Sequence, residues 1–532
     1  MKRKRSFLSI LIEWIAFAVI AFITIGAVNP LFYPKSTYVS SAWPSTSTYN
    51  GFYKMKRNSV DVLFIGSSVA ANAFCPQQMY NEYGIRSYNL SSEQQSLFLS
   101  YYWIKEAYRF QNPQIVVVDL NFLRKAHPED PLNTVESLTR KCIDPMRWSF
   151  VKMEAVHDIA RRSSAFAEDA EHAGYERQSE MSYYFPNIRF HSRWSSGLGS
   201  EDFDYHMCNY SELKGWNTLI YYADPELNPY EPYVYSESED SSEVDPTQEE
   251  YLRRIGELCK AKGTKLILVN LPGNMTAGFD NACRRISADL GADYYNYCEK
   301  SIYEQIGAHM PLECVLKHSN YWGSLKLSAY TGKLLSTQYD VPSVSDEQYE
   351  NTKAFYAQVG KNANLQYVTD FDQYLDALND PTYTVFMSIN DDGTAALTDT
   401  DMEKMRILGV QTDLSDKFRC SWYVVLSSGS ALEENISSNQ LITAYGNFGK
   451  EKQDYSISSA GSETGASKSS IIINGQEYSH NTRGINIVVY DNTCRAMIDS
   501  VTFDTSANRK PQRSWFIDMQ RNDINWNYNS SW

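Results

Sequence analysis

The sequence lacks the residue patterns that hold metal ions and structural disulfides. Its nine cysteines are scattered, with no Cys-x-x-Cys pair and no cluster of histidine and cysteine at metal-ligand spacing. An odd number of cysteines without a framework indicates a fold that does not depend on disulfides. We therefore predict no metal site and no cofactor.

Basic residues are also scarce. The 49 lysines and arginines are outnumbered by 64 acidic residues, which gives a formal net charge of −15, and no extended basic stretch follows residue 5. Nucleic-acid-binding proteins need basic surfaces that neutralise phosphates. The composition therefore argues against nucleic acid as a partner.

The chain is long and rich in aromatic residues. Its 532 residues exceed what one core can organise, which favours two or three domains. Aromatic residues make up 14% of the sequence, and 39 of them are tyrosines. Surfaces rich in tyrosine often contact extracellular or carbohydrate partners, although tyrosine also packs in cores.

The amino terminus has the pattern of a membrane anchor. Four basic residues at 2–5 precede an apolar stretch at 7–28 that only Glu13 interrupts. As a helix this stretch would be about 33 Å long, enough to cross a bilayer, and the basic cluster should stay cytoplasmic. We predict a single-pass anchor at 1–29 in the cell membrane, a linker at 30–58, and the bulk of the chain extracytoplasmic. A cleaved signal peptide is the alternative, but the apolar run is long and no clear cleavage site follows it.

The stretch at 59–340 has an α/β rhythm. The apolar run Val62–Ile65 is typical of a strand buried on both faces, and it ends in Gly66-Ser67-Ser68. Strand-like segments at 86–90 and 115–121 follow, separated by helical patterns, so we expect a doubly wound parallel sheet. Serines at a strand end can project hydroxyls where α/β proteins keep their sites, or they can simply cap a helix.

The strand ends resemble the sequence blocks of SGNH (GDSL-like) hydrolases, and a fourth block appears as HSNYWGSLK at 318–326. This resemblance implies that Ser68 is the nucleophile and His318 the general base. It also implies that the N–H groups of Ser68 and Ser91 and the amide of Asn121 bind the oxyanion.

The sequence departs from the family pattern at three positions. Ser67 stands where aspartate is usual, Ser91 replaces a glycine, and Val315 replaces the aspartate that usually precedes the histidine by three residues. Either another carboxylate such as Glu313 or Asp293 orients His318, or serine and histidine work as a dyad, or the site is inactive.

An insert at 142–245 interrupts the α/β pattern. Large inserts commonly form a wall of the substrate groove. The motif RFHSRW at 189–194 resembles the insert of membrane-anchored SGNH proteins of the D-alanine-transfer-protein type, which are encoded beside membrane-bound O-acyltransferases. This resemblance implies such an acyltransferase as a partner. The insert's aromatic and basic side chains are candidates for stacking against sugars, and equally for its core: Tyr183, Tyr184, Phe185, Arg189, His191 and Trp194.

The α/β pattern of the sequence ends at about residue 340. We expect a connector at 341–380, with two helical stretches bridged by a strand-like segment at 365–370, and a β-rich α+β module at 381–532. Thr400 and Glu403 form a capping-box pattern for a helix that ends at Gly409, and Asn474-Gly475 is a strong hairpin signal.

The last module resembles the interleukin-like epithelial–mesenchymal-transition inducer domain. The motifs FMSINDDGTAALT, FRCSWYVVL, RGINIVVYDN and DSVTFDT carry the resemblance over about 381–505, in an order that looks circularly permuted. The resemblance implies carbohydrate binding, for which Asp391, Asp392 and Trp422 are the candidates. The alternative is a structural spacer in which the aspartates only make a turn.

These patterns together predict an extracytoplasmic O-acyl esterase or O-acyltransferase that acts on a cell-surface polysaccharide through a serine nucleophile. The alternative is a non-catalytic, glycan-binding accessory protein of a membrane-bound O-acyltransferase system.

Overall fold

The structure is a computed structural model. It describes residues 7–28, 31, 45–127, 130–166, 178–190, 195, 212–217, 231–238, 243–307, 314–315, 318–450 and 452–513.

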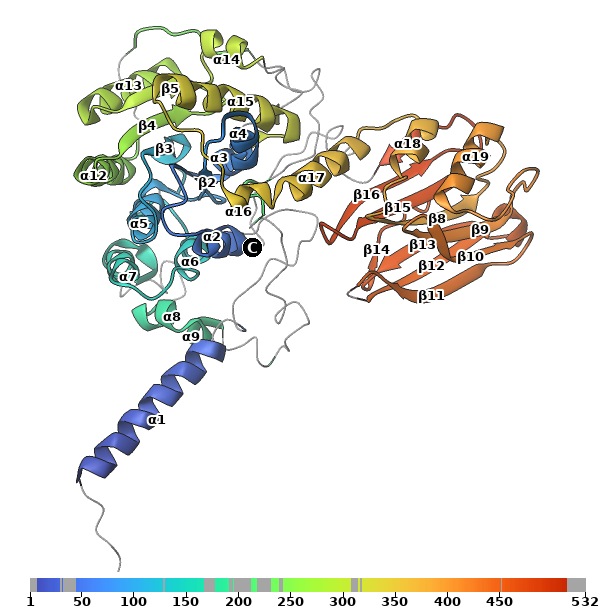
Figure 1. Cartoon of the computed structure of the whole chain (residues 1–532), viewed down its shortest axis with the longest axis horizontal. Helices are drawn as coiled ribbons and strands as arrows, with labels where there is room; N and C mark the ends of the chain where they lie inside the picture. Colours follow the sequence, from blue (N-terminus) through green and yellow to red (C-terminus); the bar gives the residue numbers. More distant parts are fainter. Residues whose placement is uncertain are drawn as a thin grey trace, which may run out of the picture.

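The first helix, α1 (Phe7–Val28), projects from the α/β domain, with its carboxyl end beside α8 and α9 (Figure 1). Its segment Ile10–Val28 is long and apolar enough to cross a membrane, and none of it is buried inside the protein. These properties suit a single-pass membrane anchor and a signal sequence alike.

Five parallel strands form the central sheet, in the order β2-β1-β3-β4-β5. The predicted strand at 62–65 is β1, and all its residues are buried. The mixed α/β fold expected from the apolar runs is confirmed. The strands are β1 (Val62–Ile65), β2 (Ser87–Asn89), β3 (Ile115–Asp119), β4 (Lys265–Asn270) and β5 (Asp293–Asn296).

Helices cover both faces of this sheet. Leu63 and Ile65 of β1 pack into one apolar cluster, whereas Val62 and Phe64 pack into another on the opposite face. The first cluster includes residues of α2 (Ser45–Lys54), α5 (Leu97–Ala107), α6 (Glu136–Ile143), α7 (Phe150–Arg162), α12 (Pro246–Lys262) and α13 (Ala277–Leu290). The second includes residues of α3 (Ser68–Ala73), α4 (Pro76–Tyr83), α14 (Lys300–Ile306) and α15 (Tyr321–Gln338).

Helix α2 lies in the stretch that the sequence suggested as a linker. Tyr49 stacks on Trp103 with ring centroids 4.1 Å apart, and its hydroxyl donates to Gln95 at 2.7 Å. Phe52 is fully buried beside it. Helix α2 therefore packs against the α/β domain from Thr48 on, within the stretch predicted as a linker at 30–58.

The insert adds short helices and one docking segment. Helices α8 (Glu180–Tyr184) and α9 (Pro186–Phe190) follow α7. Residues 212–217 return to the domain, where the fully buried Trp216 lies 5.8 Å from the ring of Tyr321 and 6.1 Å from that of Tyr356.

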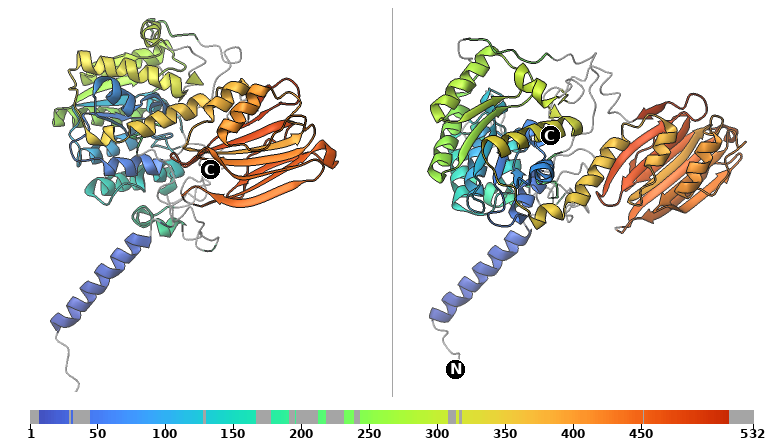
Figure 2. Two further views of the ribbon diagram at one scale, coloured as in Figure 1. Left: turned by 45° about the vertical axis from the view of Figure 1, so that its right-hand side comes forward. Right: turned by 45° about the horizontal axis from the view of Figure 1, so that its top comes forward.

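The connector is helical. It consists of α16 (Glu347–Glu350), α17 (Lys353–Leu365) and α18 (Phe371–Ala377). The strand expected at 365–370 is wrong, because Leu365 ends α17 and the Asp370 side chain caps α18 by accepting from the Gln373 N–H at 3.0 Å. Figure 2 shows α17 running from the α/β domain to the last sheet.

Ten strands form the C-terminal sheet around β8 (Tyr383–Asp391). Strand β8 pairs antiparallel with β9 (Ser421–Ser427) and β15 (Gly484–Asp491), and parallel with β12 (Gln453–Gly461). Val385, Met387 and Ile389 of β8 pack under α18 and α19 (Asp399–Leu408), whereas Phe386 faces the opposite cluster. The other strands of this sheet are β10 (Ser430–Ser437), β11 (Ile442–Phe448), β13 (Lys468–Ile473), β14 (Gln476–Glu477), β16 (Ala496–Phe503) and β17 (Pro511–Arg513).

Two local predictions in this module have different outcomes. The hairpin at Asn474-Gly475 is confirmed, with positive φ at both residues, between β13 and β14. The capping box of α19 is formed by Thr398 and Asp401 rather than by the expected pair two residues later, because Asp401 reaches back to the Thr398 backbone.

Candidate active site

Three of the predicted catalytic residues lie at one edge of the parallel sheet. Ser68 begins α3 after β1, Ser91 follows β2, and Asn121 follows β3. These strands are neighbours in the order β2-β1-β3, so their carboxyl ends meet. The Ser92 N–H donates to the Gly66 carbonyl at 3.2 Å, which holds the loop after β2 against the turn before Ser68.

Ser67 is fully engaged in holding this turn. Its hydroxyl donates to Oδ2 of Asp119 at 2.8 Å and accepts from the Val69 N–H at 3.3 Å, which caps α3. Its own N–H donates to the same carboxylate oxygen at 3.3 Å. Ser67 therefore holds the turn between β1 and α3.

Asp119 is a site residue that the sequence argument missed. It closes β3, is buried, and its Oδ1 also accepts from the Asn121 N–H at 3.0 Å. A Cβ at Gly66 would lie 2.5 Å from the Asp119 Cβ, so only glycine lets the two strand ends approach this closely. The available signal was a single acid at the end of an otherwise apolar strand.

Asn121 is oriented towards the same turn. It opens a 3-10 turn, Asn121–Leu123, and its side-chain amide donates to the Ser67 hydroxyl at 3.3 Å. An amide group has two N–H donors, so one remains for a second acceptor. The structure thus brings the Asn121 amide to the side chain of the residue that precedes Ser68.

Ser68 and Ser91 are both buried, with 6% and 1% of their surfaces exposed. The Ser91 hydroxyl oxygen has no hydrogen-bond partner within the part of the chain that the structure describes. A buried hydroxyl without a partner is unfavourable, so this position lowers the stability of the turn.

His318 lies on a short strand beside α3. Strand β7 (His318–Ser319) pairs antiparallel with β6 (Cys314–Val315), so Val315 is opposite His318 in the hairpin. The backbone of β7 packs against α3, the helix that Ser68 begins. The side chain of His318 lies outside what the structure describes, so the predicted contact between Ser68 and the imidazole stays a prediction.

The two acids considered as partners of His318 have different outcomes. Asp293 begins β5 and therefore lies at the amino edge of the sheet, where it accepts from the Tyr339 hydroxyl at 2.6 Å and pairs with Lys265 at 2.9 Å. The suggestion that Asp293 orients His318 is therefore wrong. Glu313 lies outside the described residues.

The aromatic residues of the insert are distributed between the core and the surface. Tyr183 is fully buried, with the Arg140 guanidinium 4.0 Å from its ring centroid, so of the two alternatives given for it the core position is the one that the structure has. The Tyr184 ring contacts Trp148 at 5.1 Å, and Phe185 contacts the same ring at 5.5 Å.

Of the three remaining insert candidates, the structure describes Arg189 alone. Arg189 is half-buried and pairs with Glu136 at 2.9 Å. His191 and Trp194 lie outside the described residues.

Two of the three glycan candidates of the C-terminal module lie at the turn that ends β8, and the third lies in the core. Asp392 makes a turn in which its Oδ1 accepts from the Thr394 N–H at 3.0 Å, and Asp391 ends β8 with a φ of 62°. Trp422 is fully buried, and its indole N–H donates to Glu434 at 3.0 Å. No face of this ring is open to a sugar, so its assignment as a surface contact is wrong.

A polar groove of about 710 Å³ lies elsewhere on the same module, and the sequence argument did not find it. It lies between the starts of α18 and α19 and the segment before β17. Its walls are formed by Thr369, Asp370, Asp372, Thr398, Thr400, Asn508, Arg509, Lys510 and Pro511.

Among the residues that the structure describes, no group of three or more histidine, cysteine, aspartate or glutamate side chains could hold a metal ion. No protein-family model matches the chain, and no curated protein matches it either.

Proposed function

We propose that the chain is an extracytoplasmic, membrane-anchored serine enzyme of the SGNH type, with a doubly wound catalytic domain, that hydrolyses or transfers O-acyl groups of a cell-surface polysaccharide. The observation that carries the proposal is the meeting of Ser68, Ser91 and Asn121 at three adjacent strand ends, with the β7 backbone against α3.

Each residue has a defined part in the proposed reaction. The Ser68 hydroxyl attacks the carbonyl carbon of an acyl ester while His318 removes its proton. The Ser91 N–H and the Asn121 amide stabilise the oxyanion of the tetrahedral intermediate. The alcohol of the polysaccharide leaves with the proton, and the acyl group stays on Ser68 as an ester.

The second half of the reaction decides between the two activities. Attack of water on the acyl-serine releases the acid and gives an esterase, whereas attack of a sugar hydroxyl gives an acyltransferase. Both use the same residues, with His318 now activating the incoming oxygen.

In the proposed function, the C-terminal module binds the polysaccharide. Its groove combines carboxylates, hydroxyls, an amide and two basic side chains, which are groups that hydrogen-bond sugar hydroxyls. We assign glycan binding to this groove in place of Trp422, because Trp422 is buried.

The experiment that tests the proposal is covalent labelling. The full-length membrane fraction is treated with a fluorophosphonate, which reacts with activated serines, and the adduct is located by peptide mass spectrometry. We expect the adduct on Ser68, and we expect heat-unfolded protein to remain unlabelled. Failure to label Ser68 in folded protein would contradict the catalytic assignment.

A second candidate function is a non-catalytic accessory protein that presents a glycan to a membrane-bound O-acyltransferase. Two observations favour it, namely valine at position 315 and the location of Asp293 at the opposite edge of the sheet. It predicts glycan binding with no serine adduct, so the same labelling experiment separates the two functions.

A further inference from the structure

The α/β domain exposes apolar side chains at the end from which α1 projects. Phe150 is 84% exposed, Trp148 and Met181 are each 51% exposed, and Met153 and Ile188 are 49% and 45% exposed. We call these five residues the apolar patch. They belong to α7, α8, α9 and the turn before α7, and Figure 1 shows α8 and α9 beside the carboxyl end of α1.

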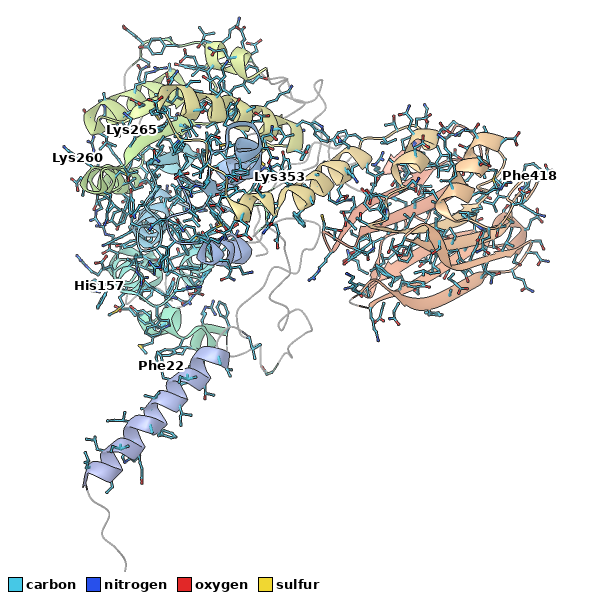
Figure 3. All side chains as sticks on the ribbon, in the orientation of Figure 1. Phe22, His157, Lys260, Lys265, Lys353 and Phe418 are labelled. Atoms are coloured by element: carbon cyan, nitrogen blue, oxygen red, sulfur yellow. The ribbon has the colours of Figure 1, made fainter. Side chains whose placement is uncertain are left out.

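The patch touches α1 directly. The Trp148 ring lies 5.7 Å from the ring of Phe22, and Figure 3 shows Phe22 on the upper part of α1. The Trp148 ring also contacts the rings of Tyr184 and Phe185. An aromatic cluster therefore joins the domain to the side of the apolar helix.

The contact between Trp148 and Phe22 lies in the last third of α1. Phe22 precedes Val28 by six residues, which is about 9 Å of helix. The 22 residues of α1 extend about 33 Å, against a hydrocarbon thickness of about 30 Å. When α1 crosses a bilayer, Trp148 is thus level with the outer part of the membrane rather than above it.

Several charged residues near the patch have partners, and Arg147, which precedes Trp148, lies over the ring of Tyr53 at 4.2 Å. On α7, Glu154 is hydrogen-bonded to Lys105, and His157 lies 4.0 Å from Glu180 of α8. This pairing lowers the cost of placing the surface near lipid. Indole and phenol rings are also the side chains that favour the boundary between headgroups and acyl chains.

We propose that the apolar patch inserts into the outer interface of the lipid bilayer and forms a second membrane contact beside α1. The proposal rests on the membrane anchor of the proposed function. Two contacts, one spanning and one interfacial, fix the tilt of the α/β domain over the membrane, which a single helix followed by a linker does not. Lipid is favoured over a protein partner because the patch lies at the depth of α1's last turns.

The test places spin labels on full-length protein reconstituted in phosphatidylcholine vesicles. Labels are attached at Phe150→Cys and, in a second variant, at Met153→Cys. The control is Phe418→Cys, a 57% exposed phenylalanine of the C-terminal module that Figure 3 shows far from α1. The unsubstituted chain, treated with the same label, serves as the blank for the native cysteines.

Collision rates with oxygen, which partitions into lipid, and with a water-soluble nickel chelate are then compared. We expect the patch labels to collide at least about threefold more with oxygen than with nickel, relative to the ratio at position 418. Equal nickel accessibility at the patch and at position 418 would overturn the proposal. Protection from both reagents would also overturn it, in favour of a protein partner.

A separate measurement distinguishes failure of the patch from failure of the anchor. Carbonate extraction that releases the chain from vesicles contradicts the anchor and the patch together. A chain that resists extraction but carries water-exposed patch labels contradicts the patch alone, and fluorophosphonate labelling of Ser68 is independent of both.

Discussion

The hydroxyl of Ser67 donates to Oδ2 of Asp119 at 2.8 Å, from one strand end to the next. This bond separates the roles of two chemically identical neighbours. Ser67 ties β1 to β3 and caps α3, whereas Ser68 is the first residue of that helix. The two serines therefore allow a matched test of the proposed nucleophile.

Ser68→Ala should abolish covalent catalysis, whereas Ser67→Ala should mainly weaken the turn. We expect Ser68→Ala to lower the rate of aryl acetate hydrolysis by about 1,000-fold or more, as loss of a nucleophile generally does. Ser67→Ala should cost about 1–2 kcal/mol of stability through the lost cap and leave most of the activity. Initial rates and thermal unfolding of both variants provide the measurement, and equal rate losses would contradict these roles.

Gly66→Ala should damage the same turn by overpacking. The new Cβ would lie 2.5 Å from the Cβ of Asp119, within a buried pair of strand ends. We expect a loss of about 1–3 kcal/mol in the free energy of unfolding, measured in urea, together with reduced activity.

The control is Gly256→Ala in α12, where the added Cβ meets the far end of Leu290 at 2.8 Å. That side chain can move, and alanine favours a helix interior, so the change should be close to neutral. A Gly66 variant as stable as the Gly256 variant would contradict the tight approach of β1 and β3.

The sheet and the edge of the site could be predicted from the sequence, because short continuous apolar runs such as Val62–Ile65, followed by small polar residues, are typical of buried parallel strands. The strand ends then place Ser68 and Asn121 together by topology alone. Asp119 could not be singled out in this way, since an acid after an apolar run is equally typical of a solvated loop. Its burial depends on the partner serine from β1, which only the fold brings near.

The error at Trp422 has a related cause. Sequence alternation distinguishes a solvated face of a strand from a buried one, but β9 is buried on both faces. Trp422 and Val424 pack under the helices, whereas Tyr423 and Val425 pack in the opposite cluster. An aromatic residue in such a strand has the same local pattern whether it binds a ligand or fills a core.

Trp422→Ala should therefore unfold the module rather than remove a glycan contact. Loss of a fully buried tryptophan typically costs about 3–5 kcal/mol. Tyr445→Ala, at an 80% exposed position on β11, should change stability by no more than about 0.5 kcal/mol. Thermal unfolding of the two variants compares them, and a Trp422 variant with native stability would restore the surface assignment.

Lys214 should make stability depend on pH at the junction of the insert and the connector. Its buried ammonium donates to Thr352 at 2.6 Å and to Gln77 at 3.1 Å, and burial lowers its pKa to about 8. In the unfolded chain the pKa returns to its ordinary value of about 10.4.

The sign of the effect follows from proton binding. Between about pH 8 and pH 10 the unfolded chain holds more protons at this position than the folded chain, so the free energy of unfolding rises with pH. The slope from this residue is at most about 1.4 kcal/mol per pH unit, and below pH 8 the full penalty of burying the charge remains.

Lys214→Met should remove this dependence. Any constant loss from the broken hydrogen bonds shifts its stability equally at all pH values, so the comparison uses only the slope between pH 7.5 and pH 9.5, measured by urea unfolding. We expect the unsubstituted protein to gain stability relative to the variant across this range. Lys260→Met, at an exposed position on α12, is the control, since its side chain meets water in both states. Parallel pH profiles for the Lys214 variant and the unsubstituted protein would show that the Lys214 pKa is not lowered.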